Sequence, residues 1–255
     1  MMQSVMKFTL GTLFAILLAG CGGGGSSSGG GGNIVTGTAE GVYSGTVTGG
    51  NSFDGIVLED GTFYSLYGTR TGGVLYVGGF ATGNGTSYNG SYTIANLKDY
   101  LSSGVIYTGT VSASYGVGST LSGTLIENGV TGTFTSTVIP TSTYVYNAGA
   151  NLSHISGAWA LTDLQGAAVS MNIATSGAFT ATSAGCSFSG SLTPRASGKN
   201  VFNLAITFGG SPCALPGQTA TGIAIEYVLS NGLRQLIMAG TNVAQTAGTA
   251  AFGTR

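Results

Sequence analysis

Apolar and polar side chains alternate with a period of two residues along most of this chain, and this rhythm limits the fold more than any other feature. In "VTGTFTSTV" (130–138), four threonines separate residues that are mostly apolar or small. The segments "CSFSGSLT" (186–193) and "NVFNLAITF" (200–208) follow the same rule. Such a period places alternate side chains on opposite faces of a strand. The sequence therefore predicts an all-β protein.

The composition also disfavours helices. Charged residues make up 6% of the chain, where about a quarter is usual, and 47 of the 255 residues are glycine. Abundant Gly, Thr, Val and Tyr suit strands joined by tight turns. The best helical candidate is "IANLKDYLSSG" (94–104), which we expect to form one short helical turn in a loop. The net charge of −1 and the lack of a basic patch argue against a nucleic-acid partner.

Turn signals divide the chain into two sets of about eight strands each. Short turns such as "EDG", "ENG" and "SNG" join consecutive segments, which predicts antiparallel meanders. Eight strands suffice to close a sheet into a barrel that is filled by its own side chains or holds one small ligand. We therefore expect two antiparallel barrels of about eight strands. Their ranges are 41–139 and 157–255, with a linker over 140–156.

The two halves of the chain echo each other in two places. "GVYSG" (41–45) aligns with "GAWAL" (157–161), and "SYNGSYT" (87–93) aligns with "SFSGSLT" (187–193). The spacing between the echoes differs in the two halves, so duplication and independent origin both remain open.

The chain begins with a targeting segment. An apolar run over 8–18 is too short to span a membrane, which needs about 20 apolar residues, but it fits a secretory signal. It ends at Leu-Ala-Gly-Cys21, followed by eleven residues of Gly and Ser only. This pattern resembles the lipobox of bacterial lipoproteins. The resemblance implies removal of residues 1–20, acylation of Cys21 with diacylglyceryl and palmitate chains, and a disordered tether over 21–40.

Other interpretations of this segment are a plain signal peptide with a chance cysteine, or an uncleaved membrane anchor. The lipoprotein resemblance also implies a location, because Gram-negative lipoproteins retained in the inner membrane tend to carry Asp after the cysteine. Gly22 stands there instead, which points to the outer membrane without indicating the face. The membrane would then be a partner through the N-terminal acyl chains.

Two further cysteines, Cys186 and Cys213, lie in the second predicted barrel. In an exported protein such a pair is typical of a disulfide, and no CxxC redox motif occurs. Such a disulfide would close a loop of about 27 residues, which stabilises a fold by about 3 kcal/mol in the chain-entropy model.

The second half opens with Gly-Ala-Trp159. This resembles the Gly-x-Trp of lipocalins and related eight-stranded barrels, in which the Trp plugs one barrel end and packs against a basic residue from the last strand. Arg234 or Arg255 would supply that residue here, whereas the simpler interpretation is a buried core aromatic. A looser resemblance links the Gly-rich halves and anchor to surface lipoproteins such as transferrin-binding protein B and factor H binding protein. It implies binding of a host or environmental protein.

The sequence offers little for catalysis or metal binding. His154 is the only histidine and falls in the expected linker, and no catalytic or P-loop motif occurs. The acids Asp54, Glu59 and Asp60 suit a hairpin turn. We therefore expect no enzyme activity, no catalytic or metal-ligating residue and no cofactor, although the eight acids leave a hydrolase as a remote alternative.

Tyrosines are the candidates for ligand binding. Eleven of the twelve precede Gly157. By alternation, Tyr88 and Tyr92 share an inward face with Ile94, and Tyr107 points inward too. A ligand in a barrel could bind their hydroxyls, or the hydroxyls could reach backbone groups of a packed core.

These observations together favour a membrane-anchored envelope lipoprotein that is a non-enzymatic binding module for an unidentified small molecule or protein. The alternative is a structural or adhesion lipoprotein of the outer membrane without a small-molecule ligand.

Overall fold

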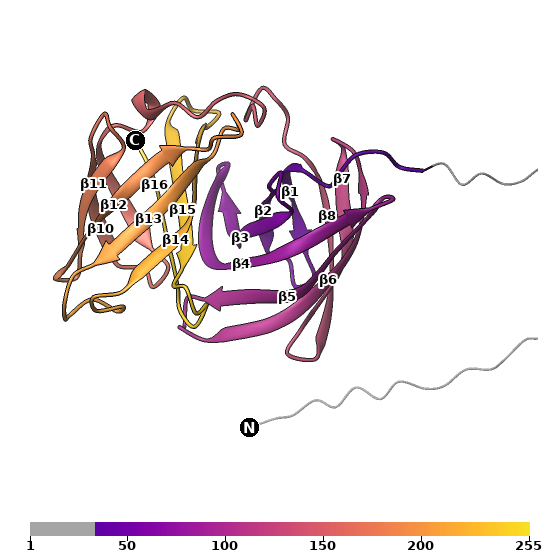
Figure 1. Ribbon diagram of the computed structural model, residues 1–255, viewed down its shortest axis with the longest axis horizontal. Coiled ribbons are helices and arrows are strands. Elements are labelled where there is room, and N and C mark those ends of the chain that lie inside the picture. The colour runs from indigo at the N-terminus through magenta and orange to yellow at the C-terminus, as the bar shows by residue number, and fades with distance from the viewer. Residues whose placement is uncertain (1–33) are drawn as a thin grey trace, which may run out of the picture. The chain divides into compact units, whose positions relative to one another are not determined.

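The alternating segments form sixteen strands that close into two antiparallel barrels of eight strands each. Figure 1 shows both in a computed structural model, which describes residues 34–255. The all-β, two-barrel prediction is confirmed. The predicted signal peptide, Cys21 and the Gly/Ser tract fall outside the described residues. Within 34–255, no helix has the length and apolarity needed to cross a membrane.

The first barrel is a simple meander in which every strand pairs with the next one. The last strand returns to the first, with Tyr43 opposite Val138, and this pairing closes the barrel. Its strands are β1 (Gly41–Val47), β2 (Ser52–Val57), β3 (Thr62–Thr71), β4 (Val74–Tyr88), β5 (Ser91–Leu101), β6 (Ile106–Gly116), β7 (Thr120–Glu127) and β8 (Val130–Val138).

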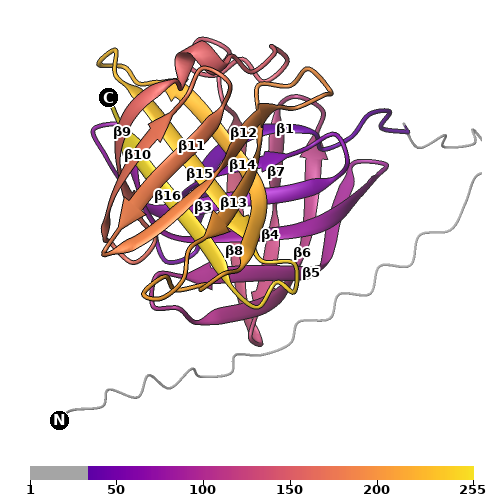
Figure 2. The same ribbon diagram turned by 60° about the vertical axis from the view of Figure 1, so that its left-hand side comes forward.

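The second barrel repeats this topology, and Figure 2 brings its strands to the front. Closure comes from the pairing of Phe252 in the last strand with Thr162 in the first. The segment between the barrels contains one short helix, η1 (Leu152–His154). The strands are β9 (Gly157–Asp163), β10 (Ala168–Ile173), β11 (Ala178–Ser183), β12 (Cys186–Pro194), β13 (Phe202–Phe208), β14 (Thr219–Val228), β15 (Arg234–Thr241) and β16 (Gly248–Thr254).

The helical turn expected over 94–104 is wrong, because most of this segment belongs to β5. The register of β5 shifts between Ile94 and Leu97, where one extra residue bulges out of the pairing with β6. A bulge lets two residues three positions apart face the same side. Ile94 and Leu97 are both buried in the barrel, and their spacing imitates a helical period.

The turn between β4 and β5 was also missed by the sequence analysis. Asn89 and Gly90 form it, with φ of 46° and 80°, as in the Asn-Gly turns of tight hairpins. The segment "SYNGSYT" (87–93) is therefore a hairpin turn, whereas "SFSGSLT" (187–193) lies within β12. This pair of echoes does not mark equivalent positions.

Besides the apolar interior of each barrel, an apolar cluster joins the outer faces of the two barrels. It includes Leu75 and Phe80 from the first barrel and Ile237 from the second, all nearly inaccessible to solvent. At its edge the Arg195 side chain bonds to Glu59 and Asp60, each at 2.6 Å. The two barrels are therefore joined by an apolar interface as well as by the chain.

Candidate functional site

One end of the first barrel is closed by the chain that precedes β1. The Tyr43 hydroxyl donates to the carbonyl oxygen of Ala39, and the Tyr115 hydroxyl donates to that of Gly37, both at 2.8 Å. These bonds hold residues 37–39 across the barrel end, where Ala39 is completely buried, so the disorder expected over 21–40 is wrong for this last part of the range. Access to the interior from this end is blocked.

A cavity of about 310 Å³ lies inside the other half of the first barrel. Thr48 and Asn51, from the turn between β1 and β2, lie at its rim together with Glu127 at the end of β7. Its volume lies at the lower limit of small-molecule sites, about 300 Å³. Most of the wall is apolar and includes Phe53, Phe63, Ile94, Leu97, Leu121 and Phe134.

Ser65 and Tyr92 belong to the polar part of the wall, and its titratable side chains also include four from four strands: Tyr67, Asp99, Tyr107 and Glu127. The Tyr67 hydroxyl lies 2.9 Å from each Asp99 carboxylate oxygen and donates its proton to this carboxylate. Tyr107 lies directly opposite Asp99 in the pairing of β5 with β6. The cavity therefore combines an apolar wall with one group of acids and phenols.

Two glycines make this convergence possible. Tyr67 on β3 reaches Asp99 on β5 by crossing β4 at Gly79, where a Cβ would lie 2.2 Å from the Tyr67 hydroxyl oxygen. The Glu127 side chain crosses Gly109 on β6 in the same manner, where a Cβ would lie 2.9 Å from its Cγ. The absence of side chains at these two positions lets residues from separate strands meet.

Burial changes the ionisation of this group. It raises the pKa of Asp99 to about 6, although the hydrogen bond from Tyr67 acts in the opposite direction. Burial, followed by the nearby charge of Asp99, raises the pKa of Glu127 to about 7. Burial and the Asp99 carboxylate also raise the pKa of Tyr67, so its hydroxyl remains a donor. Both carboxyl groups therefore lose their protons at higher pH than ordinary acids do.

The three predicted tyrosines do not form one group. Tyr92 and Tyr107 line the cavity, but the Tyr92 hydroxyl is already bonded to the carbonyl oxygen of Gly61 at 2.8 Å. Tyr88 is 80% exposed, so its inward orientation was wrong. Ser87 pairs with Tyr92 and shares its face, and the next residue, Tyr88, must therefore face outward. Sequence analysis missed Tyr67, Asp99 and Glu127.

The second barrel is also closed by an aromatic side chain at the end where the chain enters it. The Trp159 indole is buried and donates to the carbonyl oxygen of Ile155 at 2.6 Å. The Arg255 guanidinium lies 4.2 Å from the centre of the indole ring. Of the two arginines considered, Arg234 instead bonds to Glu226 at 2.5 Å. Trp159 is therefore a buried aromatic residue whose ring packs against Arg255, which directly follows the last strand.

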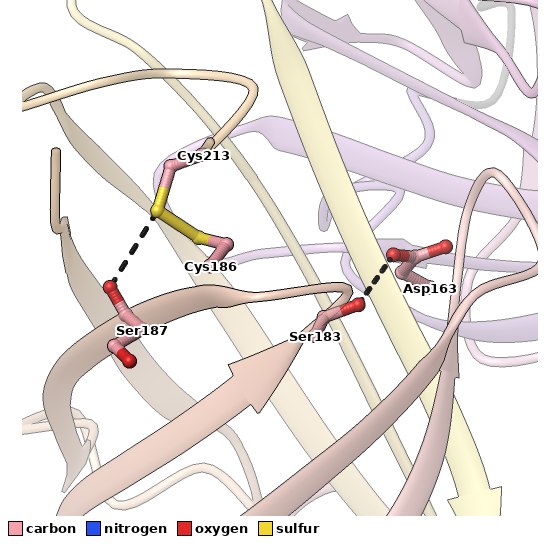
Figure 3. The surroundings of a disulfide bond; sticks show 5 residues. All are labelled: Asp163, Ser183, Cys186, Ser187 and Cys213. Atoms are coloured by element: carbon pink, nitrogen blue, oxygen red, sulfur yellow. Dashed lines mark hydrogen bonds between the residues drawn. A yellow bond between two sulfur atoms is a disulfide. The ribbon is translucent and has the colours of Figure 1, made fainter. Parts of the chain in front are cut away.

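The disulfide between Cys186 and Cys213 is confirmed, and it lies at the other end of the second barrel (Figure 3). A cavity of about 370 Å³ is found there, with Asp163 at its rim. Asp163 accepts hydrogen bonds from the backbone N–H groups of Gln165 and Ala167 and from the Ser183 hydroxyl. This carboxylate serves the turn and offers little to a ligand.

The other candidate polar residues have structural partners. His154 lies in η1 with its Nδ1 3.5 Å from a Glu226 oxygen. Asp60 accepts from the backbone N–H of Thr62 in the hairpin turn, and it also pairs with Arg195. Among residues 34–255, no group of three or more His, Cys, Asp or Glu side chains is placed to hold a metal ion.

No protein-family model and no curated protein matches this chain. Among solved structures, a Bacteroides fragilis protein described as a "putative outer membrane protein" matches with 14% sequence identity and a TM-score of 0.25. The match covers 86% of this chain and 96% of that one.

Proposed function

We propose that this protein is a lipid-anchored envelope lipoprotein whose first barrel binds a small, largely apolar molecule without transforming it. The observation that carries the proposal is the cavity of about 310 Å³, closed at one end and lined by aromatic and aliphatic side chains around a few polar groups. This combination is typical of ligand sites in small barrels.

The location rests on the sequence. Cys21 is preceded by Leu-Ala-Gly, as in the lipobox. The next residue is Gly22 rather than Asp, as in lipoproteins sent to the outer membrane. We expect Cys21→Ser to release the chain from membranes into the soluble fraction, because stable anchoring requires acyl chains. Immunoblots of membrane and soluble fractions measure this effect. Unchanged membrane retention would contradict the lipid anchor while leaving the binding site untouched.

Native mass spectrometry of the full chain, extracted from its own envelope, tests the binding function. We expect a bound mass that is lost on denaturation. Ala81 lines the cavity, so Ala81→Leu fills part of it and should lower the bound fraction. Ala181 is buried inside the second barrel, and Ala181→Leu is the matched control that should leave the bound fraction unchanged.

Two results would contradict the binding function. The first is a chain that never carries a bound mass, and the second is an equal loss of bound mass in the two variants. The first of these would favour the alternative of a structural or adhesion lipoprotein.

A further inference from the structure

The carboxylates of this protein fall into two groups. All eight acids lie within the described residues, and six of them have a cation or a set of hydrogen-bond donors as partners. These six are Glu40, Asp54, Glu59, Asp60, Asp163 and Glu226. The remaining two are Asp99 and Glu127, and both line the cavity of the first barrel.

No basic side chain lies in that cavity, because its lining contains no Lys, Arg or His. Five of the six Lys and Arg residues within 34–255 are held by other partners. The sixth is Lys98, next to Asp99 in sequence. Since Leu97 and Asp99 face the interior, the alternation of β5 places Lys98 on the outer face.

An uncompensated carboxylate in an apolar interior is costly. Asp99 is 4% exposed, and its hydrogen-bond donors within the described chain are the hydroxyl of Tyr67 and the backbone N–H of Tyr100. These two donors cannot satisfy both carboxylate oxygens, which together accept about four hydrogen bonds. When ionised, Asp99 and Glu127 therefore form a negative site on the cavity wall, and no basic side chain lines this cavity to neutralise it.

We propose that the ligand of this cavity, on the proposed binding function, is a cationic amphiphile: a protonated amine on an apolar body. The ammonium group lies between Asp99 and Glu127, and the apolar body contacts the wall around Phe53 and Phe63. Charge-assisted hydrogen bonds to carboxylates are about twice as strong as neutral ones, and burial strengthens them further. The Tyr67 hydroxyl holds the Asp99 carboxylate in place for this contact.

Three probes with the same alkyl chain and different head groups test this inference: octylamine, octan-1-ol and octanoate. Calorimetric titrations at pH 8 favour the ionised form of both acids, whose pKa values burial raises to about 6 and about 7. The full chain carries Cys21→Ser, so that no detergent is needed that would compete for the cavity. We expect octylamine to bind about tenfold more tightly than octanol, and octanoate to bind least.

The double variant Asp99→Asn/Glu127→Gln should bring the affinity ratio of octylamine to octanol close to one while octanol binding persists. Retained octanol binding shows that the variant is folded. Asp163→Asn removes one negative charge from the second barrel and keeps the Oδ1 atom that accepts from the backbone, so its ratio should stay near ten.

The possible failures are distinguishable. Equal binding of octylamine and octanol by the unaltered acids would overturn the cationic ligand class and leave the binding function standing. Failure of all three probes to bind would also overturn this ligand class, and the bound mass in the Ala81→Leu experiment would then decide the binding function by itself.

Discussion

The two barrels are closed by the same device at the end where the chain enters each of them. Tyr43 in β1 and Trp159 in β9 are both buried, and each donates a hydrogen bond to the carbonyl of the residue four positions earlier. Both follow a Gly-x pair, so the echo of "GVYSG" with "GAWAL" marks equivalent positions. The shared plug shows that end closure depends on local sequence.

The other halves of the barrels differ in chemistry rather than in architecture. In the second barrel the single acid at the cavity rim, Asp163, is bonded to its own turn, and a disulfide ties the loop after β13 to β12. In the first barrel, Asp99 and Glu127 remain without a cation. The same fold therefore carries one barrel held together by a cross-link and one with a polar site inside it.

Removal of the disulfide should produce the largest difference in stability between the two barrels. Cys186→Ala/Cys213→Ala frees a loop whose ends are 27 residues apart, which should lower the free energy of unfolding by about 3 kcal/mol. Fluorescence of Trp159, the only tryptophan, reports the second barrel during urea unfolding. Octylamine binding reports the first barrel and should persist in the absence of urea. If the variant loses octylamine binding as well as the stability that Trp159 fluorescence reports, the interface unites the barrels into one cooperative unit.

Much of the fold could be predicted from the sequence, and the polar site could not. The all-β fold, most strand positions and the disulfide follow from alternation and cysteine number. Asp99 was missed because the bulge after Ile94 shifts the alternation, and the interior face of β5 beyond it cannot be assigned from spacing alone. Glu127 was missed because its approach to Asp99 depends on glycines in other strands.

Gly79→Ala should have the next largest effect, confined to the first barrel. The added Cβ would lie 2.2 Å from the Tyr67 hydroxyl oxygen and force the ring away from Asp99. Overpacking of this kind costs about 2 kcal/mol, which urea unfolding followed by tyrosine fluorescence would detect. In Gly132→Ala the nearest atom to the new Cβ is 3.9 Å away, so this control should be almost neutral. Equal destabilisation by the two substitutions would contradict the close approach of Tyr67 to β4.

Arg255→Met should weaken the plug of the second barrel by about 1 kcal/mol, through loss of the cation–π contact and of charged hydrogen bonds to backbone carbonyls. These bonds join Arg255 to the carbonyl oxygens of Ser156 and His154, at 2.7 and 2.8 Å. A lower urea midpoint and a shifted emission of Trp159 are the expected readouts. Lys98→Met is the matched control in the first barrel, and it should leave both readouts unchanged.

The pH dependence of stability separates the two kinds of acid. The pKa values of Asp99 and Glu127 are about 6 and about 7 in the folded state, against ordinary values of 3.8 and 4.5. At pH values between the ordinary and the raised pKa, the folded state therefore binds more protons than the unfolded state. Stability should therefore fall as pH rises from about 4 to about 7.

Burial acts against ionisation at Glu59 as well, but its hydrogen bond with Arg195 leaves the pKa of Glu59 below 4.5. The contribution of Glu59 to stability is therefore lost only at lower pH. Asp99→Asn should flatten the fall in the thermal midpoint above pH 4.5, because it removes one acid with a raised pKa and also the charge that, after burial, raises the pKa of Glu127. A fall of unchanged steepness in this variant would place the titrating groups outside the cavity.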